Sequence, residues 1–244
     1  MRKLIIGAAA LLAVALPSIA MADTGGSLQL TYASINDDLA ESKDNVVALS
    51  GVVITDLNAP GWRLQANATG ADADAYDNSF AYSQGELHVV YDMGHVQVGA
   101  FAGMANLNGW GYYEYGVEAA LNLSRGQIAV SVAGASSPNS DRDNITTATL
   151  SGHLNVTENL SVGASVSTSD ADELADSIDS YAVNVAYEIP NSSVTLAAGY
   201  RSSDFNNNNV DFIGVSVAWG FGDGARGRRM PGAAALIPDA IAIE

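Results

Sequence analysis

Strict alternation of apolar and polar residues runs through almost the whole chain and constrains the fold more than any other feature. In the stretch 181–189, one face carries Tyr181, Val183, Val185, Tyr187 and Ile189, with Ala, Asn, Ala and Glu between them. Successive side chains of a β-strand point to opposite faces, so this spacing predicts a strand with one large apolar face and one small polar face.

The same period recurs along the chain, and no segment carries a sustained helical spacing of apolar residues. The sequence therefore predicts an all-β protein of about twelve strands. The predicted strands are 27–35, 45–55, 61–70, 82–92, 95–105, 111–123, 126–135, 145–156, 159–168, 180–189, 192–202 and 210–221.

The connections between these segments alternate in length. After every second strand the chain turns within a few residues, at 56–61, 93–94, 124–125, 157–158 and 190–192. The other connections are longer, polar and mostly acidic, at 36–44, 71–81, 106–111, 136–144, 169–179 and 203–209. An antiparallel up-and-down meander with every long loop at one end produces this rhythm, whereas a Greek-key sandwich generally does not.

The polar face of these strands cannot form a dry core. Between residues 62 and 69 it carries Arg63, Gln65, Asn67 and Thr69, and elsewhere it is rich in Gly, Ala and Ser. Buried charges and amides need partners, and small side chains leave voids. The apolar face is continuous, so it requires an apolar environment around the whole sheet. The sequence therefore predicts an antiparallel up-and-down transmembrane β-barrel with a water-filled interior.

Aromatic residues gather near both ends of the apolar faces. Two aromatic rims around an aliphatic band are typical of a sheet that crosses a bilayer with two polar interfaces. The predicted girdles are Tyr32, Tyr113, Tyr115, Tyr181 and Tyr200 toward the long loops, and Trp62, Tyr91, Tyr187, Trp219 and Phe221 toward the short turns.

The two ends of the chain are predicted to lie outside the barrel. Arg2 and Lys3, an apolar run and Ala20-Met21-Ala22 together predict a signal peptide over residues 1–22. The barrel occupies 23–221, and residues 222–244 form a flexible periplasmic tail. Without residues 1–22 the chain has 8 basic and 27 acidic residues, a net charge of −19, which argues against a nucleic-acid partner.

These features resemble the outer-membrane β-barrels of Gram-negative bacteria, in the manner of a small porin. The resemblance covers 27–221 and includes the last strand, FIGVSVAWGF, which is similar to the terminal signal read by the barrel-assembly machinery. In this class the chain normally ends at the aromatic residue of the signal, whereas this chain continues for 23 residues after Phe221.

The resemblance implies an outer-membrane protein in contact with lipid and lipopolysaccharide. It implies passive diffusion of small hydrophilic solutes as the function. The alternatives are a non-conducting barrel for surface adhesion or envelope integrity, and an exported soluble β-sandwich or barrel. The acidic loop end is expected to disfavour anions at the mouth.

Nine charged or titratable residues are predicted to line the lumen. They serve either as a polar constriction that screens solutes by charge or as a solvated ion-pair network that stiffens the barrel. They are Arg63, Glu86, His88, His95, Glu114, Glu118, His153, Glu188 and Arg201.

No metal, cofactor or catalytic site is predicted from these residues. A two-residue turn at Met93-Gly94 places Asp92 opposite His95, and it leaves His88 opposite Gly99 without a suitable third ligand. Neighbours two residues away on the strand of His153 lie about 7 Å apart, too far for a nucleophile and its base. The GDGARG stretch at 222–227 lacks the helix and strand that a dinucleotide site needs.

Overall fold

The computed structural model describes residues 24–37, 43–75, 78–138, 144–171, 177–205 and 208–222. The predicted signal peptide and the tail after Gly222 lie outside the described residues. Within the described ranges, no helix is long and apolar enough to cross a membrane.

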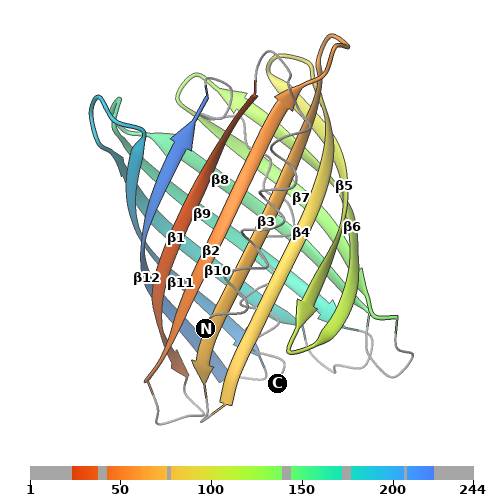
Figure 1. Ribbon diagram of the computed structural model, residues 1–244, viewed down its shortest axis with the longest axis vertical. Coiled ribbons are helices and arrows are strands. Elements are labelled where there is room, and N and C mark those ends of the chain that lie inside the picture. The colour runs from red at the N-terminus through yellow and green to blue at the C-terminus, as the bar shows by residue number, and fades with distance from the viewer. Residues whose placement is uncertain are drawn as a thin grey trace.

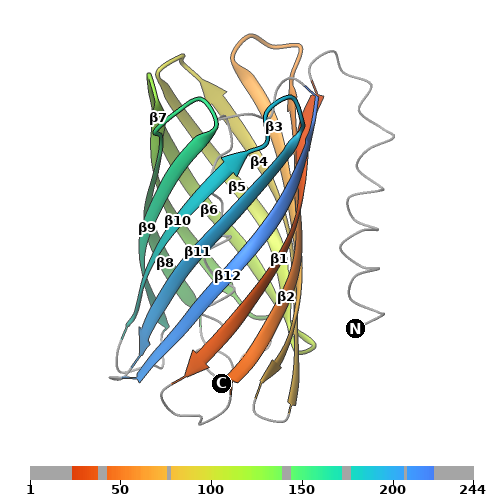
Figure 2. The same cartoon turned by 90° about the vertical axis from the view of Figure 1, so that its left-hand side faces the viewer.

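Twelve antiparallel strands form one closed barrel, which confirms the predicted fold class and strand number. Each strand pairs with its neighbours in the sequence, and β12 closes the wall by pairing with β1 (Figures 1 and 2). The strands are β1 (Thr24–Asp37), β2 (Lys43–Asp56), β3 (Trp62–Ala75), β4 (Asn78–Asp92), β5 (Val96–Leu107), β6 (Trp110–Leu123), β7 (Gly126–Ser136), β8 (Ile145–Asn155), β9 (Leu160–Ala171), β10 (Ile178–Glu188), β11 (Val194–Phe205) and β12 (Asn208–Phe221).

The two ends of the barrel are defined by their connections. The turn end, uppermost in Figure 1, carries the turns that follow the even-numbered strands, together with Thr24 and Phe221. The loop end carries the connections that follow the odd-numbered strands. Parts of five predicted loops, 38–42, 76–77, 139–143, 172–176 and 206–207, lie outside the described residues.

The turn between β4 and β5 differs from the prediction. Met93 N donates to Val96 O at 2.8 Å, so the two turn residues are Gly94 and His95. Gly94 has φ of 88°, which suits glycine at the first position of such a turn. As a result Asp92 lies opposite Gln97 and His88 lies opposite Phe101, so the predicted Asp92–His95 pairing was wrong.

The connection at 106–111 is a tight turn where a longer loop was predicted. Leu107 pairs with Trp110 around Asn108-Gly109, whose φ angles are 49° and 90°. Asn-Gly is the preferred sequence for a turn that needs two positive φ values, and this signal was missed. Other strands also extend into predicted loops, so that Asp72, Asp74 and Asp204 belong to β-strands.

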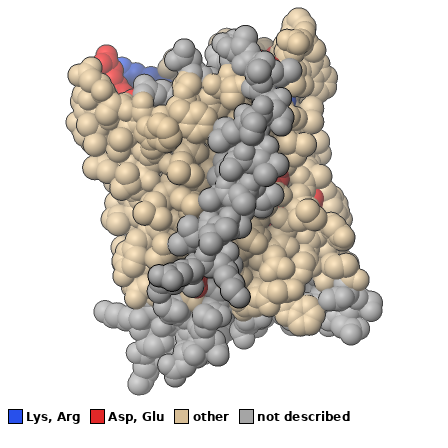
Figure 3. Space-filling view, in the orientation of Figure 1, with Lys and Arg blue, Asp and Glu red and all other residues tan. Residues whose placement is uncertain are grey.

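The outward face of the barrel is apolar between its two ends. Val117 is 61% exposed and Ile213 is 66% exposed, although both are large aliphatic residues. On the part of this wall that grey atoms leave uncovered in Figure 3, few side chains are those of Lys, Arg, Asp or Glu. An exposed apolar band around a closed barrel is typical of a surface that meets lipid, because a soluble protein rarely leaves so much apolar surface in contact with water.

The predicted girdle residues lie at the expected ends of outward faces. Tyr32 and Tyr200 donate their hydroxyl groups to Asn45 Oδ1 at 2.8 Å and to Asp211 Oδ1 at 2.9 Å near the loop end. At the turn end, ring centroids of Trp62 and Tyr91 lie 5.0 Å apart, and those of Trp219 and Phe221 lie 5.8 Å apart. Their role as anchors at the two membrane interfaces remains a prediction.

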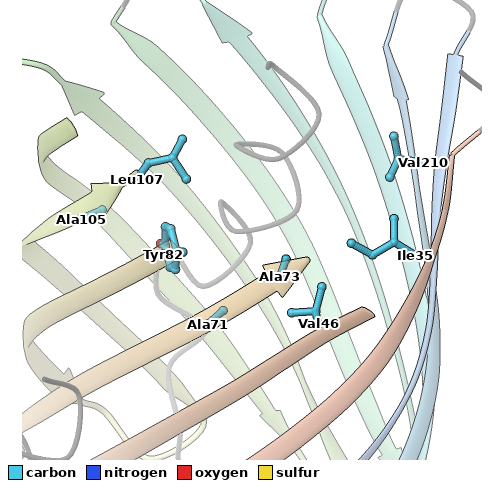
Figure 4. Close-up of a cluster of buried hydrophobic side chains, with 8 residues drawn as sticks. All are labelled: Ile35, Val46, Ala71, Ala73, Tyr82, Ala105, Leu107 and Val210. Carbon is cyan, nitrogen blue, oxygen red and sulfur yellow. The ribbon is translucent and has the colours of Figure 1, made fainter. Parts of the chain in front are cut away.

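The inward face is not small and polar along its whole length. Near the loop end, inward side chains of β12 and β1–β5 form a buried apolar cluster, drawn in Figure 4. The loop-end cluster consists of Ile35, Val46, Ala71, Ala73, Tyr82, Ala105, Leu107 and Val210. The loop end therefore departs from the predicted polar interior on the side of β12 and β1–β5, whereas on β8–β11 it carries the buried polar residues Thr147, Ser169, Ser180 and Ser203.

Candidate functional site in the barrel lumen

The inner surface of the barrel has two unlike walls. On β3–β6 it carries large polar side chains, and we call this side the polar wall: Arg63, Gln65, Asn67, Gln84, Glu86, His88, Gln97, Glu114 and Glu118. On β7–β12 and β1 it carries mainly small side chains, and we call this side the small-residue wall. Its inward residues include Thr31, Ala129, Ser151, Gly163, Ser165, Ala182, Thr195, Ala197, Gly199, Gly214, Ser216 and Ala218.

His88 is the centre of the polar wall. Its Nδ1 lies 2.8 Å from Oε1 of Glu118, and its Nε2 lies 2.8 Å from Nδ2 of Asn67. Oε2 of Glu86 is 3.5 Å from the same Nε2, and the imidazole stacks on the Phe101 ring with centroids 5.1 Å apart. If the Asn67 amide donates to Nε2, the ring proton is on Nδ1 and is donated to Glu118.

The large side chains of the polar wall lie flat because glycines face them on the next strand. A Cβ at Gly99 would lie 2.9 Å from Oε1 of Glu118, and one at Gly103 would lie 3.0 Å from Cγ of Glu86. A Cβ at Gly116 would overlap the ring of Phe101. These are direct cross-strand pairs: Glu118 with Gly99, Glu86 with Gly103 and Phe101 with Gly116. The missing side chains leave room for the carboxylates and the ring along the wall instead of across the lumen.

The carboxylates of the polar wall are held inside it. Glu86, Glu114 and Glu118 are 5%, 3% and 4% exposed. Gln84 Nε2 donates to Glu114 Oε2 at 2.9 Å, and Asn67 Nδ2 lies 3.2 Å from Glu86 Oε2. Buried carboxylates require such partners, so the network is a structural part of the wall and presents little charge to the lumen.

An ion-pair group closes the polar wall at the turn end. Nη2 of Arg63 binds Oδ2 of Asp92, and its Nε lies 3.9 Å from Oδ1 of Asp56. Nε2 of Gln97 donates to the same Asp92 oxygen at 3.3 Å. This group stands where Asp92 and His95 were expected to meet.

A cavity of about 870 Å³ lies against the small-residue wall. It is bounded mainly by inward residues of β7–β12 and β1, from Ala218 and Thr195 near the turn end to Arg201 and Phe212 toward the loop end, and it also adjoins the outward positions Val183, Ala198, Tyr200 and Val215. Arg201 and Phe212 are direct cross-strand partners, so they lie at the same level of the barrel. The cavity therefore occupies the turn end and the middle of the barrel, on the side away from the polar wall.

The structure separates the predicted lumen residues into four groups. Five belong to the polar wall, Arg63, Glu86, His88, Glu114 and Glu118, whereas His153 and Arg201 line the cavity. Glu188 faces inward at the turn end of β10, opposite Thr195. His95 instead lies exposed in the β4–β5 turn, because the turn is displaced by one residue from the predicted position. The selection of solutes by these side chains remains a prediction.

Several residues that build the site were not singled out from the sequence. Gln84 and Gln97 alternate with apolar residues just as Glu86 and His88 do, so their inward position was predictable. Their partners were not, because hydrogen bonds across strands depend on register. Among the described residues, no group of three or more His, Cys, Asp or Glu is placed to hold a metal ion.

The barrel has the fold of outer-membrane channels. An outer-membrane channel from Pseudomonas putida F1 is similar with a TM-score of 0.59 and 11% identity, over 84% of this chain and 97% of that one. The NanC porin gives a TM-score of 0.55 at 10% identity, over 78% of this chain and 98% of that one. The KdgM porin, in complex with disordered oligogalacturonate, gives 0.52 at 9% identity, over 77% and 97% of the two chains.

The sequence matches no protein-family model and no curated protein. The likeness is therefore one of architecture: this chain forms a closed twelve-stranded β-barrel, a fold like that of the outer-membrane channels named above.

Proposed function

We propose that this protein is a porin-like channel of the Gram-negative outer membrane, through which small hydrophilic solutes diffuse passively. The observation that carries this function is the cavity of about 870 Å³ beside the small-residue wall. A barrel with eight strands is just filled by its side chains, and larger barrels leave aqueous space. Here twelve strands and a wall of Gly, Ala, Ser and Thr leave that space on one side.

The two walls have different tasks in this proposal. The polar wall holds the barrel in shape through its buried hydrogen bonds and ion pairs, including His88–Glu118 and Arg63–Asp92. The small-residue wall bounds the route of the solute. Passive diffusion along it needs no catalytic group and no cofactor, only room and polar groups that replace part of the hydration shell.

The exterior supports a place in the outer membrane. The apolar band meets lipid, and the two aromatic groups lie where the interfaces would be. Outward Asp72 and Asp204 place negative charge at the loop end, which would face lipopolysaccharide and the cell exterior. The turn end, with Thr24 and Phe221, would face the periplasm, and β12 would be read by the barrel-assembly machinery.

One observation favours a second candidate, a closed barrel with a structural or adhesive role. The cavity stops at the level of Arg201 and Phe212, and the loop-end cluster beyond it is buried. A barrel that stays closed at this level would not conduct, and its loop end would carry the function.

Conductance in planar lipid bilayers separates the two candidates. Purified protein that shows heat-modifiable migration on a gel, as folded outer-membrane barrels do, would be added to a bilayer in symmetric salt. The channel function predicts discrete conductance steps, and heat-unfolded protein of the same preparation is the control. Folded protein without steps would instead support the closed barrel, and loop-end deletions that abolish surface binding would then identify its role.

A further inference from the structure

We propose that the route along the small-residue wall admits small, uncharged, hydroxyl-rich solutes at least as readily as ions of the same size. This inference presupposes the channel function proposed above and names its solute class. It runs against the simplest expectation from composition, because a chain with a net charge of −17 would be expected to form a strongly cation-selective pore.

The chemistry of the cavity lining is that of hydroxyl and amide groups. The polar lining residues include Thr31, Ser151, Ser165, Asn184, Thr195 and Ser216, distributed over β1 and β8–β12. Hydroxyls and amides both donate and accept hydrogen bonds. They can therefore exchange bonds with a sugar-like solute at each step, whichever way its hydroxyl groups are oriented.

The acidic residues of the barrel lie elsewhere. Among the described residues that line the cavity, none is Asp or Glu. The three glutamates of the polar wall are almost fully buried and bonded within that wall, and Asp92 is bound by Arg63. Asp72 and Asp204 face outward near the loop end. Apart from Glu188, which faces inward at the turn end of β10 opposite Thr195, these carboxylates are held in the polar wall or face outward near the loop end.

Two titratable side chains do line the cavity, and their places limit what they can do. His153 belongs to β8 near the turn end, directly opposite Gln127 on one side and Gly163 on the other. Arg201 lies at the far limit of the cavity, beside Phe212. A charge-selective pore is built from a ring of like charges, whereas these two groups lie at different levels of the barrel.

Desolvation gives the direction of the preference. A neutral polyol loses water molecules that a lining of hydroxyl and amide groups can replace. An ion loses a much stronger hydration shell, and dipoles without a facing charge replace only part of it. Neutral solutes should therefore enter at least as fast as charged solutes of equal size.

The test is swelling of liposomes that contain the full-length protein. Glucose, gluconate and glucosamine have similar size and differ in charge, and a salt background of about 0.15 M screens the acidic rim beyond roughly 8 Å. The proposal predicts that glucose enters at least as fast as either charged solute. Entry of gluconate or glucosamine more than about threefold faster than glucose, a difference of about 0.65 kcal/mol, would overturn it.

A matched pair of variants at Ser165 places a charge on the lining itself. Ser165→Asp should raise the entry of glucosamine relative to glucose, because it adds the carboxylate that the wall lacks. Ser165→Asn adds similar bulk without charge and should leave the ratio unchanged. If Ser165→Asp leaves the ratio as it is in the unmodified chain, while the protein is folded, solutes do not pass this wall and the inference fails.

The outcomes distinguish this inference from the channel function. Swelling that shows preference for a charged solute refutes the solute class and leaves the channel intact. No swelling with any of the three solutes, from liposomes that contain folded protein, refutes both.

Discussion

His88 and Glu118 lie on neighbouring positions of the inner wall with Nδ1 and Oε1 2.8 Å apart, and neither side chain is reached by solvent. They come from β4 and β6, with β5 between them. The contact spans the middle strand because Gly99 on β5 has no side chain there. This hydrogen bond thus connects β4 to β6 across the strand that separates them.

Removing Glu118 should destabilise the barrel. Glu118→Ala leaves the buried His88 without its main acceptor, and breaking a buried pair in this way costs about 3 kcal/mol. Glu118→Gln keeps the size of the side chain and one hydrogen bond, so its loss of stability should be about half that of Glu118→Ala. Urea unfolding from lipid vesicles measures both, and equal midpoints for Glu118→Ala and the unmodified chain would contradict the role of this pair.

The glycine facing Phe101 should be far less tolerant than a glycine in open space. A Cβ at Gly116 would overlap both the Phe101 ring and the Val132 carbonyl, so Gly116→Ala should cost about 1–3 kcal/mol through overpacking. Gly85 is the control, because a Cβ there has no neighbour within 4 Å. Gly85→Ala should be neutral or slightly stabilising in the same unfolding experiment. Equal losses of stability for Gly116→Ala and Gly85→Ala would show that the Phe101 ring does not need the space that Gly116 leaves.

The tight turn at the loop end offers a test of backbone strain alone. Gly109 has φ of 90° and no atom within 4 Å of a Cβ, so Gly109→Ala changes only the backbone preference. It should cost about 1–2 kcal/mol. Gly111, two residues on, has equal space and no positive φ, so Gly111→Ala should have little effect. A slower return to the folded gel band for Gly109→Ala alone would agree with this difference.

Cysteine labelling can test which face meets water, because the chain contains no cysteine. Asn184 lines the cavity, and its neighbour Val183 is 53% exposed on the outward face. In vesicles, Asn184→Cys should react with a small water-soluble thiol reagent, whereas Val183→Cys should be protected by lipid. The reverse pattern would mean that the faces are inverted and that the protein is not a membrane barrel.

The sequence was sufficient for the architecture because alternation depends on nothing beyond the chain itself. Tyr181, Val183 and Val185 had to face one environment and Ala182, Asn184 and Ala186 another, whatever their neighbours. The positions of the short turns then gave the strand order and the two ends.

Register and cross-strand contacts could not be obtained in the same way. Placing the turn at Met93-Gly94 instead of Gly94-His95 moved the partner of His88 from Phe101 to Gly99. The pairing of Glu118 with Gly99 depends on the register of β5 and β6 around the missed Asn108-Gly109 turn, so the compact polar wall was not foreseen. The loop-end cluster was missed for another reason: Ile35, Val46 and Val210 belong to three different strands, and only closure of the barrel brings them together.

The cavity beside the small-residue wall is the central feature of the channel, and neighbouring alanines on β11 test it most directly. Ala197 points into the cavity and Ala198 lies on the outward face, opposite Val185 and Val215. The measurement is single-channel conductance in planar bilayers for Ala197→Trp, Ala198→Trp and the unmodified chain, each shown to be folded by heat-modifiable migration. An indole in the cavity should reduce conductance to less than roughly half, because conduction depends on the width of the narrowest part, and the outward indole should leave it unchanged. Equal conductance for the two variants, or no conductance in the folded unmodified protein, would contradict a solute path along this wall.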